Sequence, residues 1–341
     1  MKNLKIFTFL FILLAAFTKA QTITFVSEKN NKPLPKVLVL DSKGNILAKS
    51  DIDGKIDRKL LISPDEKYEL IYDNISVANL SQVDINQNII KLNDRVKDIQ
   101  AVVIKGNNVA KNIYVRGNFN TYVTLNNKIN TFADGIITYI FDNKTKKLKN
   151  AIVEQYRMFR LDNPDMNRKN LDSWDYEMFM EVPEIKNAGN IEQHINNPNS
   201  KFRELKGDLR DEVEFSEAKL QSKDVGMFGY RFFDFRNIIT IAYEKNSDKK
   251  LKNLLEYNTV EYKKVKHKSE TDFNSIAIYS NFYPTEFTFN NTEKIQKVNF
   301  NTDSSNYTTK YWQDSDFPDM QKIFSKFLQE NLKEQENKKK N

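Results

Sequence analysis

Catalytic and cofactor-binding sites are often built from histidines, cysteines or glycine-rich loops. This chain offers few candidates of these kinds. His194 and His267 are its only histidines, and neither stands in an H-E-x-x-H or H-x-H context that would bring two zinc ligands together. The chain has no cysteine, which excludes disulfides and thiolate metal sites. Gly226 and Gly229 match neither a dinucleotide fingerprint nor a phosphate-binding loop, and there is no G-x-S-x-G motif. We therefore predict no metal, no cofactor and no catalytic residue, with both histidines at the surface.

Two acidic segments resemble part of a calcium-binding loop. They are residues 51–54 (Asp-Ile-Asp-Gly) and the group Asp162, Asp165 and Asn167. Neither has the glycine at position six and the glutamate at position twelve that the twelve-residue loop requires, so we predict a hairpin turn and a solvated turn. The 46 acidic residues also offer too many carboxylate pairs for the sequence to select two that could serve a hydrolase.

The densest aromatic segment is residues 227–235, Met-Phe-Gly-Tyr-Arg-Phe-Phe-Asp-Phe. Alternation along a strand would place Tyr230 and Phe232 on one face and Phe233 and Phe235 on the other. Aromatic side chains on both faces are typical of a central strand that helices cover on one side. Alternatively, one face lines an apolar cavity, and the candidate ligand-binding residues are then Tyr230, Phe232, Phe233 and Phe235.

The densest internal basic run comprises Lys263, Lys264, Lys266, His267 and Lys268. A charged hairpin end is the ordinary explanation. Contact with an anion or with a membrane surface is the alternative.

The N-terminus predicts export. Lys2 and Lys5 precede an apolar run from Ile6 to Phe17, and a small-x-small pattern ends at Ala20, so residues 1–20 fit a secretory signal peptide. The run is shorter than the roughly 18 to 20 residues that span a bilayer, and we expect no transmembrane segment in the mature chain. Removing three lysines with the signal leaves 50 basic against 46 acidic residues, a balance that argues against a nucleic-acid partner. The expected location is periplasmic or associated with the outer membrane.

Short strand-like runs separated by turn residues fill the chain from residue 23 to residue 105. Residues 33–37 (Pro-Leu-Pro-Lys-Val), residues 49–56 (Lys-Ser-Asp-Ile-Asp-Gly-Lys-Ile) and residues 99–106 (Ile-Gln-Ala-Val-Val-Ile-Lys-Gly) carry a resemblance to a known family. They resemble the carboxypeptidase-regulatory-like domain, a prealbumin-like β-sandwich that opens many exported envelope proteins of Bacteroidota. The resemblance implies a β-sandwich over residues 21–106, with no chemistry of its own.

Residues 107–111 are polar and rich in turn formers, which suggests a linker to a second domain over residues 112–336. Residues 113–125 alternate strictly, as in a long strand with one buried face, and residues 142–145 suggest a hairpin connection. Residues 161–222 break this rhythm, and we interpret them as a helical insertion that covers a sheet. Further strands are expected over residues 229–235, 238–244, 254–265, 273–283, 285–290, 295–301 and 307–312.

The chain should end in an amphipathic helix. Met320, Ile323, Phe324, Phe327, Leu328 and Leu332 recur at helical spacing, and residues 337–341 are expected to form a disordered tail. The predicted fold is mainly β: a prealbumin-like sandwich, then an antiparallel, curved sheet with covering helices and this C-terminal helix.

Three functions fit this architecture. The leading hypothesis is a non-enzymatic binding or scaffolding role in the cell envelope, with an envelope protein or a lipid as partner. The second is a periplasmic carrier that holds the acyl chain of a lipid or lipoprotein in a curved-sheet cavity. The third is an exported hydrolase. Ligand identity and oligomeric state are not encoded in any motif of the sequence.

Overall fold

The computed structural model describes residues 22–61, 67–72, 75–93, 103–105, 110–161, 179–189, 191–195, 201–207, 210–219, 225–227, 229–289, 295–313 and 330–338. The main division of the chain into two compact units lies between Asp94 and Arg95. The predicted signal peptide and the group Asp162, Asp165 and Asn167 lie outside the described residues. Both units are built from β-sheets, which confirms that the chain is mainly β.

The first unit contains two sheets. One has the order β4 (Lys55–Asp57), β1 (Thr22–Ser27), β7 (Ile89–Leu92), and the other has the order β3 (Ile46–Lys49), β2 (Leu38–Leu40), β5 (Lys67–Tyr72), β6 (Ile75–Ser81). Two short 3₁₀ helices, η1 (Arg58–Leu61) and η2 (Asp84–Asn86), connect them. All pairings are antiparallel except that of β1 with β7, which is parallel and which the sequence did not indicate.

Both sheets of the first unit contribute to one hydrophobic core. Phe25 from β1 and Tyr68 from β5 are completely buried in it. The predicted turn at residues 51–54 is confirmed, because the carboxylate of Asp51 accepts hydrogen bonds from the backbone of Asp53 (3.0 Å) and Lys55 (2.8 Å). It is not a hairpin, since the strands that it joins, β3 and β4, lie in different sheets. Gly54 has φ +72°, a conformation that favours glycine.

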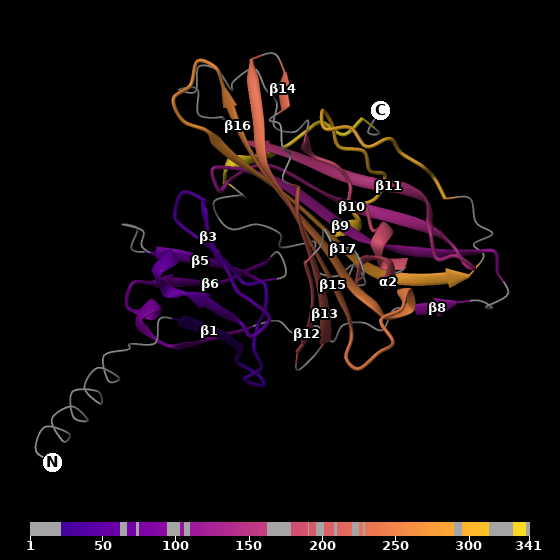
Figure 1. Cartoon of the computed structure of the whole chain (residues 1–341), viewed down its shortest axis with the longest axis horizontal. Helices are drawn as coiled ribbons and strands as arrows, with labels where there is room; N and C mark the ends of the chain where they lie inside the picture. The colour runs from indigo at the N-terminus through magenta and orange to yellow at the C-terminus, as the bar shows by residue number, and fades with distance from the viewer. Residues whose placement is uncertain are drawn as a thin grey trace, which may run out of the picture. The chain divides into compact units, whose positions relative to one another are not determined.

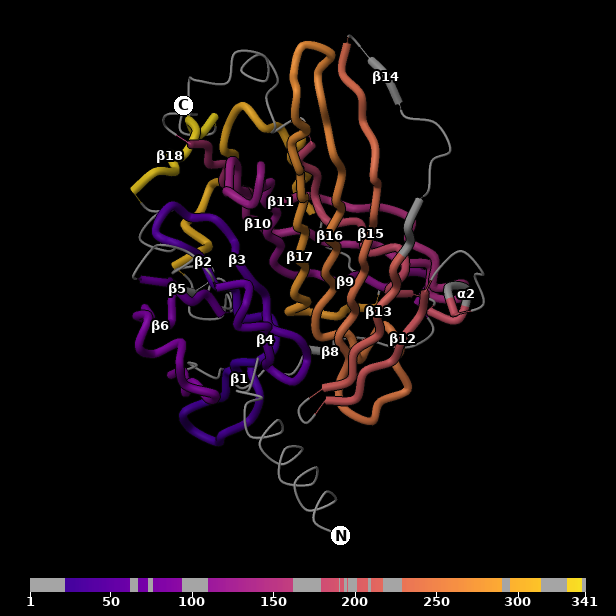
Figure 2. Tube along the Cα trace, turned by 60° about the vertical axis from the view of Figure 1, so that its left-hand side comes forward, coloured from indigo at the N-terminus to yellow at the C-terminus, as the bar shows by residue number. Residues whose placement is uncertain are grey.

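The second unit is organised around one eleven-stranded sheet. Its order is β12 (Lys201–Lys206), β13 (Arg210–Lys219), β15 (Tyr230–Glu244), β16 (Leu254–His267), β17 (Asn274–Phe289), β9 (Asn112–Leu125), β10 (Lys128–Asp142), β11 (Leu148–Leu161) and β18 (Leu332–Glu334). In addition, β14 (Val225–Met227) pairs with β15, and β8 (Val103–Lys105) pairs with β17. The strand direction turns steeply between β10–β11 and β15–β16, as expected for a strongly twisted sheet (Figures 1 and 2).

One face of this sheet carries the main core of the second unit. Phe119, Ile241 and Phe282 are completely buried there, and the short segments η4 (Lys186–Gly189), α2 (Glu192–Ile195) and η5 (Leu251–Asn253) lie near or contribute to this core. Gly135 is required beneath Phe119, since a Cβ at this position would lie 2.6 Å from the Phe119 ring and 2.3 Å from the carbonyl oxygen of Gln155. A glycine of this kind lets a sheet bend while an aromatic ring covers the gap.

The period-two pattern of residues 113–125 is confirmed as strand β9, and the turn after β10 begins at Asp142, as predicted. The expectation of a single buried face holds only for the first half of β9. From Gly117 onward both faces are buried, with Asn118 and Asn120 on the face opposite Phe119.

The predicted boundary of the first domain at residue 106 is wrong. Strand β8, which ends the family-like segment, pairs in parallel with β17 of the second unit through Val103 and Glu286. The predicted linker over residues 107–111 is wrong at its C-terminal end too. Ala110 is buried and its carbonyl accepts a hydrogen bond from the Asn143 side chain (2.7 Å), while Lys111 accepts one from the Asn143 backbone (3.0 Å).

The prediction of a helical insertion over residues 161–222 is also wrong. Strands β12 and β13 lie within it, and the described helical segments η4 and α2 have four residues each. The strands predicted at residues 295–301 and 307–312 are absent as well. These residues run irregularly and include η6 (Tyr311–Gln313).

The predicted C-terminal helix falls mostly on residues 314–329, outside the described residues. Its last stripe position, Leu332, lies in β18, where it pairs with Leu161 of β11. The predicted tail is wrong at its start, since Asn337 is buried and its side chain bonds the backbone of Tyr307. In the part of the chain that the structure describes, no helix has the length and apolar character needed to cross a bilayer.

Candidate functional site

A pocket lies along the outer edge of β11, in the second unit. Residues 296–306 run beside this strand and are held to it at two places. The backbone of Val298 donates to the carbonyl of Val153 (2.8 Å), and Asn306 and Tyr156 exchange two backbone hydrogen bonds of 2.9 Å. The pocket between these attachments has a volume of about 370 Å³.

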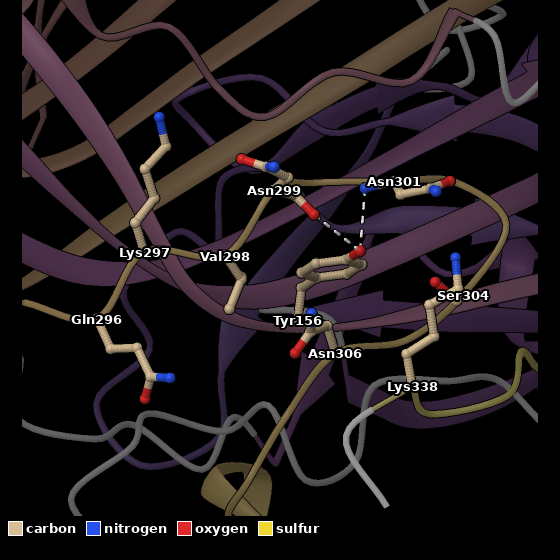
Figure 3. Close-up of a pocket in the computed structure, with 9 residues that line it drawn as sticks. All are labelled: Tyr156, Gln296, Lys297, Val298, Asn299, Asn301, Ser304, Asn306 and Lys338. Atoms are coloured by element: carbon tan, nitrogen blue, oxygen red, sulfur yellow. Dashed lines mark hydrogen bonds between the residues drawn. The ribbon is translucent and has the colours of Figure 1, made fainter. Parts of the chain in front are cut away.

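Tyr156 lies at the centre of the pocket (Figure 3). Its ring is buried and packs against Phe300 at a centroid distance of 4.8 Å. Its hydroxyl donates to the carbonyl of Asn299 (3.2 Å) and accepts a hydrogen bond from the backbone of Asn301 (3.0 Å). Burial is the main reason why the pKa of Tyr156 is raised, so the hydroxyl stays neutral and acts as a structural anchor.

The lining of the pocket is dominated by amides, and we call it the amide pocket. Its walls are Tyr156, Gln296, Lys297, Val298, Asn299, Asn301, Ser304, Asn306 and Lys338. Among these lining residues there is no carboxylate and no histidine. The Oδ1 of Asn306 is buried and accepts no hydrogen bond from the described residues, an acceptor that a buried water molecule would satisfy.

Lys338 is fixed at the pocket by its own backbone. Its N–H donates to the carbonyl of Ser305 (3.2 Å), and the preceding Asn337 bonds both the N–H and the carbonyl of Tyr307. Because these bonds hold the chain, the Lys338 side chain extends along the pocket from a defined starting point (Figure 3).

Sequence reasoning missed the amide pocket. It treated residues 295–301 as a strand and residues from 337 onward as a tail. The signal that could have revealed it is the density of Asn299, Asn301 and Asn306 within eight residues, since asparagine disfavours strands and favours turns.

The aromatic segment of β15 is arranged differently from the prediction. Asp234 has φ +54°, and the register with β16 shifts between Phe233 and Arg236, which marks a β-bulge. The bulge brings Phe235 into the same apolar cluster as Tyr230 and Phe232. Phe233 alone lies apart and packs against Phe273 at 5.6 Å.

The apolar cluster around Phe232 is a second core of the sheet. It includes Met158, Met180 and Val265, and Tyr230 and Phe232 are buried in it. Thus the structure brings three of the four candidate ligand-binding residues together and separates Phe233 from them.

The basic run 263–268 lies at the end of β16 and at the turn that leads to β17. Lys263 lies over the ring of Phe179 at 4.7 Å, and burial is the main cause of its lowered pKa. Lys264 pairs with Asp234 at 2.9 Å. His267 is half-buried, with its Nδ1 2.6 Å from the hydroxyl of Ser269, so the prediction of a surface position holds only in part.

His194 lies in α2, far from His267 in the chain, and among the described residues no three histidine or acidic side chains gather in a way that could hold a metal ion. Three buried carboxylates are instead paired with arginine. Arg210 bonds both Glu212 (2.9 Å) and Glu256 (2.8 Å), and Arg157 bonds Asp134 (Nε to Oδ1, 3.0 Å). Each of these carboxylates is therefore already engaged by an arginine within the fold.

The Asp134–Arg157 pair is the most enclosed of these. Asp134 is completely buried and also accepts a hydrogen bond from the hydroxyl of Tyr311 (2.7 Å), while the Arg157 guanidinium lies 4.2 Å from the Trp312 ring. Burial, and then the charge of Asp134, raise the pKa of Tyr311 well above its ordinary value. We interpret this cluster as structural.

The amide pocket is therefore a candidate binding site, since its lining offers hydrogen-bonding groups and neither a carboxylate nor a histidine. A search of known protein-family models finds no match to the chain, and a search of curated proteins finds no relative.

Proposed function

We propose that this chain is a non-enzymatic binding protein of the bacterial cell envelope, and that it holds a small polar ligand in the amide pocket. The observation that carries this proposal is the lining of the pocket, in which Gln296, Asn299, Asn301 and Asn306 dominate. Amide side chains donate and accept hydrogen bonds without exchanging protons near neutral pH, so they can hold a ligand without activating it.

The envelope location belongs to the proposal and rests on the signal-like pattern of residues 1–20. The carboxypeptidase-regulatory-like identity of the first unit belongs to it as well. It is supported by two small sheets that share one core, the arrangement that a prealbumin-like sandwich would have. A scaffolding role for that unit, next to a ligand-binding second unit, fits this division.

Filling the amide pocket should abolish ligand binding and leave the fold intact. Asn299 is exposed, and only its carbonyl is used by Tyr156, so Asn299→Trp should be tolerated and should occupy the pocket mouth. We expect a panel of sugars, amino acids and short peptides to include a compound that raises the melting temperature of the wild type but not that of Asn299→Trp. The compound should be recovered chemically unchanged, as mass spectrometry can check.

Lys310→Trp is the matched control, since Lys310 is exposed and does not line the pocket. It should keep the wild-type response. Conversion of the ligand into a product would contradict the proposal, and so would an undiminished response in Asn299→Trp.

A second candidate function is the carriage of an acyl chain, and the regrouped aromatics of β15 favour it. Tyr230, Phe232 and Phe235 now face one apolar cluster that also contains two methionines, whose flexible side chains adapt to varied apolar shapes.

If the cluster opens to a ligand, a fluorescent acyl probe should bind saturably, and Phe232→Ala should weaken binding far more than Phe233→Ala, because only Phe232 faces the cluster. If the cluster is instead a closed, packed core, the probe should show no saturable binding. Phe232→Ala should then lower the free energy of unfolding by about 3–5 kcal/mol. Urea unfolding of both variants, measured beside the probe titration, separates the two results.

A further inference from the structure

We infer that the amide pocket selects an acidic oligosaccharide, that is, a short sugar chain that carries carboxylate or phosphate groups. This inference rests on the proposed binding function and names the class of ligand. Two features of the lining lead to it, its charge and its hydrogen-bonding groups, and the size of the pocket supports it.

The charged groups of the pocket all have the same sign. Lys297 and Lys338 lie on opposite sides of the Tyr156 hydroxyl (Figure 3), and both are exposed. Neither forms an ion pair within the described part of the chain, and the carboxylate of the nearby Asp303 is engaged by Arg160 (3.2 Å). Two ammonium groups that flank a site without a carboxylate attract an anion.

Uncharged hydrogen-bonding groups fill the space between the two lysines. Asn301 uses its Oδ1 to accept from the backbone of Asp303 (2.7 Å), which orients the amide and leaves its NH₂ as a donor. Gln296 and Asn299 are exposed, and the amide of each carries both donors and an acceptor. Donors and acceptors side by side match sugar hydroxyls, each of which both donates and accepts.

The size of the pocket and the burial of its aromatic ring argue against an inorganic anion or a nucleotide base as the ligand. The pocket volume of about 370 Å³ exceeds by roughly tenfold the space that one water-sized group takes in a liquid, so an inorganic anion would leave most of it empty. The side chains of Tyr156 and Val298 are buried, so the ring of Tyr156 offers no exposed face on which a base could stack. A hydroxyl-rich, negatively charged molecule satisfies the lining best.

Isothermal titration of the full chain tests the inference with four probes. Tetragalacturonate supplies carboxylates, trehalose 6-phosphate supplies a phosphate, maltotetraose is a neutral sugar chain, and inorganic phosphate is a simple anion. We expect one of the acidic sugars to bind with one site per chain, at least about tenfold more tightly than maltotetraose or inorganic phosphate, since bonds to charged groups contribute about 1.5–3 kcal/mol. The acidic sugar that binds more tightly identifies the anionic group, and added salt should weaken its binding.

The lysine variants locate the effect. Lys297→Ala and Lys338→Ala should each weaken binding of the acidic sugar about tenfold. Lys310→Ala, at an exposed lysine outside the pocket, should leave it unchanged.

Three results would overturn the inference. They are equal binding of maltotetraose, binding of inorganic phosphate as tight as that of the acidic sugars, or wild-type affinity in both pocket lysine variants. None of these removes the proposed binding function, which fails only if no compound of the wider panel binds in a way that Asn299→Trp blocks. If none of the four probes binds while another compound does, the ligand class is wrong and the binding function stands.

Discussion

Replacing Arg157 with leucine is expected to destabilise the second unit by about 3–5 kcal/mol. Among the described residues, the substitution leaves the completely buried carboxylate of Asp134 with the hydroxyl of Tyr311 as its side-chain partner, and it removes the cation from the ring of Trp312. A buried charge without a counter-ion carries a desolvation penalty that one neutral hydrogen bond does not offset. Urea unfolding followed by tryptophan fluorescence measures the loss.

Two controls show whether the cause is the uncompensated charge. Arg203→Leu removes a pair with Glu214 in which the Arg203 side chain is 62% exposed, and it should change stability by no more than about 1 kcal/mol. The double variant Asp134→Leu/Arg157→Leu should be more stable than Arg157→Leu alone, because both charges are gone. If Arg157→Leu unfolds at the wild-type urea concentration, the pair is not the structural anchor that its burial indicates.

Alkaline pH is expected to unfold the protein abruptly. Five tyrosines, namely Tyr122, Tyr139, Tyr243, Tyr257 and Tyr311, are buried, and burial is the first cause of the raised pKa of each. In the unfolded chain these groups lose their protons near pH 10, whereas in the folded chain they retain them. The folded state therefore binds more protons, and its stability falls as the pH rises above 10 until the folded pKa values are reached.

The size of the effect follows from the number of groups. Each tyrosine lowers the stability by about 1.4 kcal/mol per pH unit, so five together lower it by about 7 kcal/mol per unit. Since native stabilities are typically 5–15 kcal/mol, unfolding should be complete within about two units above pH 10. Circular dichroism and tyrosinate absorbance should change together in a pH titration.

Tyr243→Phe provides the control. The hydroxyl of Tyr243 is buried without a hydrogen-bond partner among the described residues, so its removal deletes an ionisable group and breaks no bond. This variant should stay folded to a higher pH than the wild type. Tyrosinate absorbance that rises fully before any loss of circular dichroism would contradict the mechanism.

Local patterns in the sequence predicted the strands well and their assembly poorly. The alternation of residues 113–125 predicted β9 because side-chain period is a local property of a strand. The residues of β8 also look like a strand, but no local feature indicates that they pair with β17, more than 180 positions later in the chain. The domain boundary was misplaced for that reason.

The other errors have three different causes. The bulge at Asp234 reverses the parity of β15, so a prediction from alternation alone puts Phe235 on the wrong face. Strand β12 escaped notice because Lys201, Arg203, Glu204 and Lys206 give it the composition of a solvated loop. The amide pocket joins β11 to residues about 140 to 150 and about 180 positions away, and only tertiary structure reveals such a site.

The two edges of the large sheet differ in what protects them from pairing with a second copy of the chain. On the β11 side, backbone groups that could recruit a strand from another molecule are occupied: Tyr156 by Asn306, Met158 by Ser305 and Gln335, and Phe159 to Leu161 by β18. On the opposite side, β12 is short, and its four charged residues disfavour pairing with a second copy. The C-terminal residues thus cover part of the β11 edge as well as completing a pocket, and we expect a proteolytic cut before Leu332 to leave the backbone of Phe159 to Leu161 open to pairing with another chain.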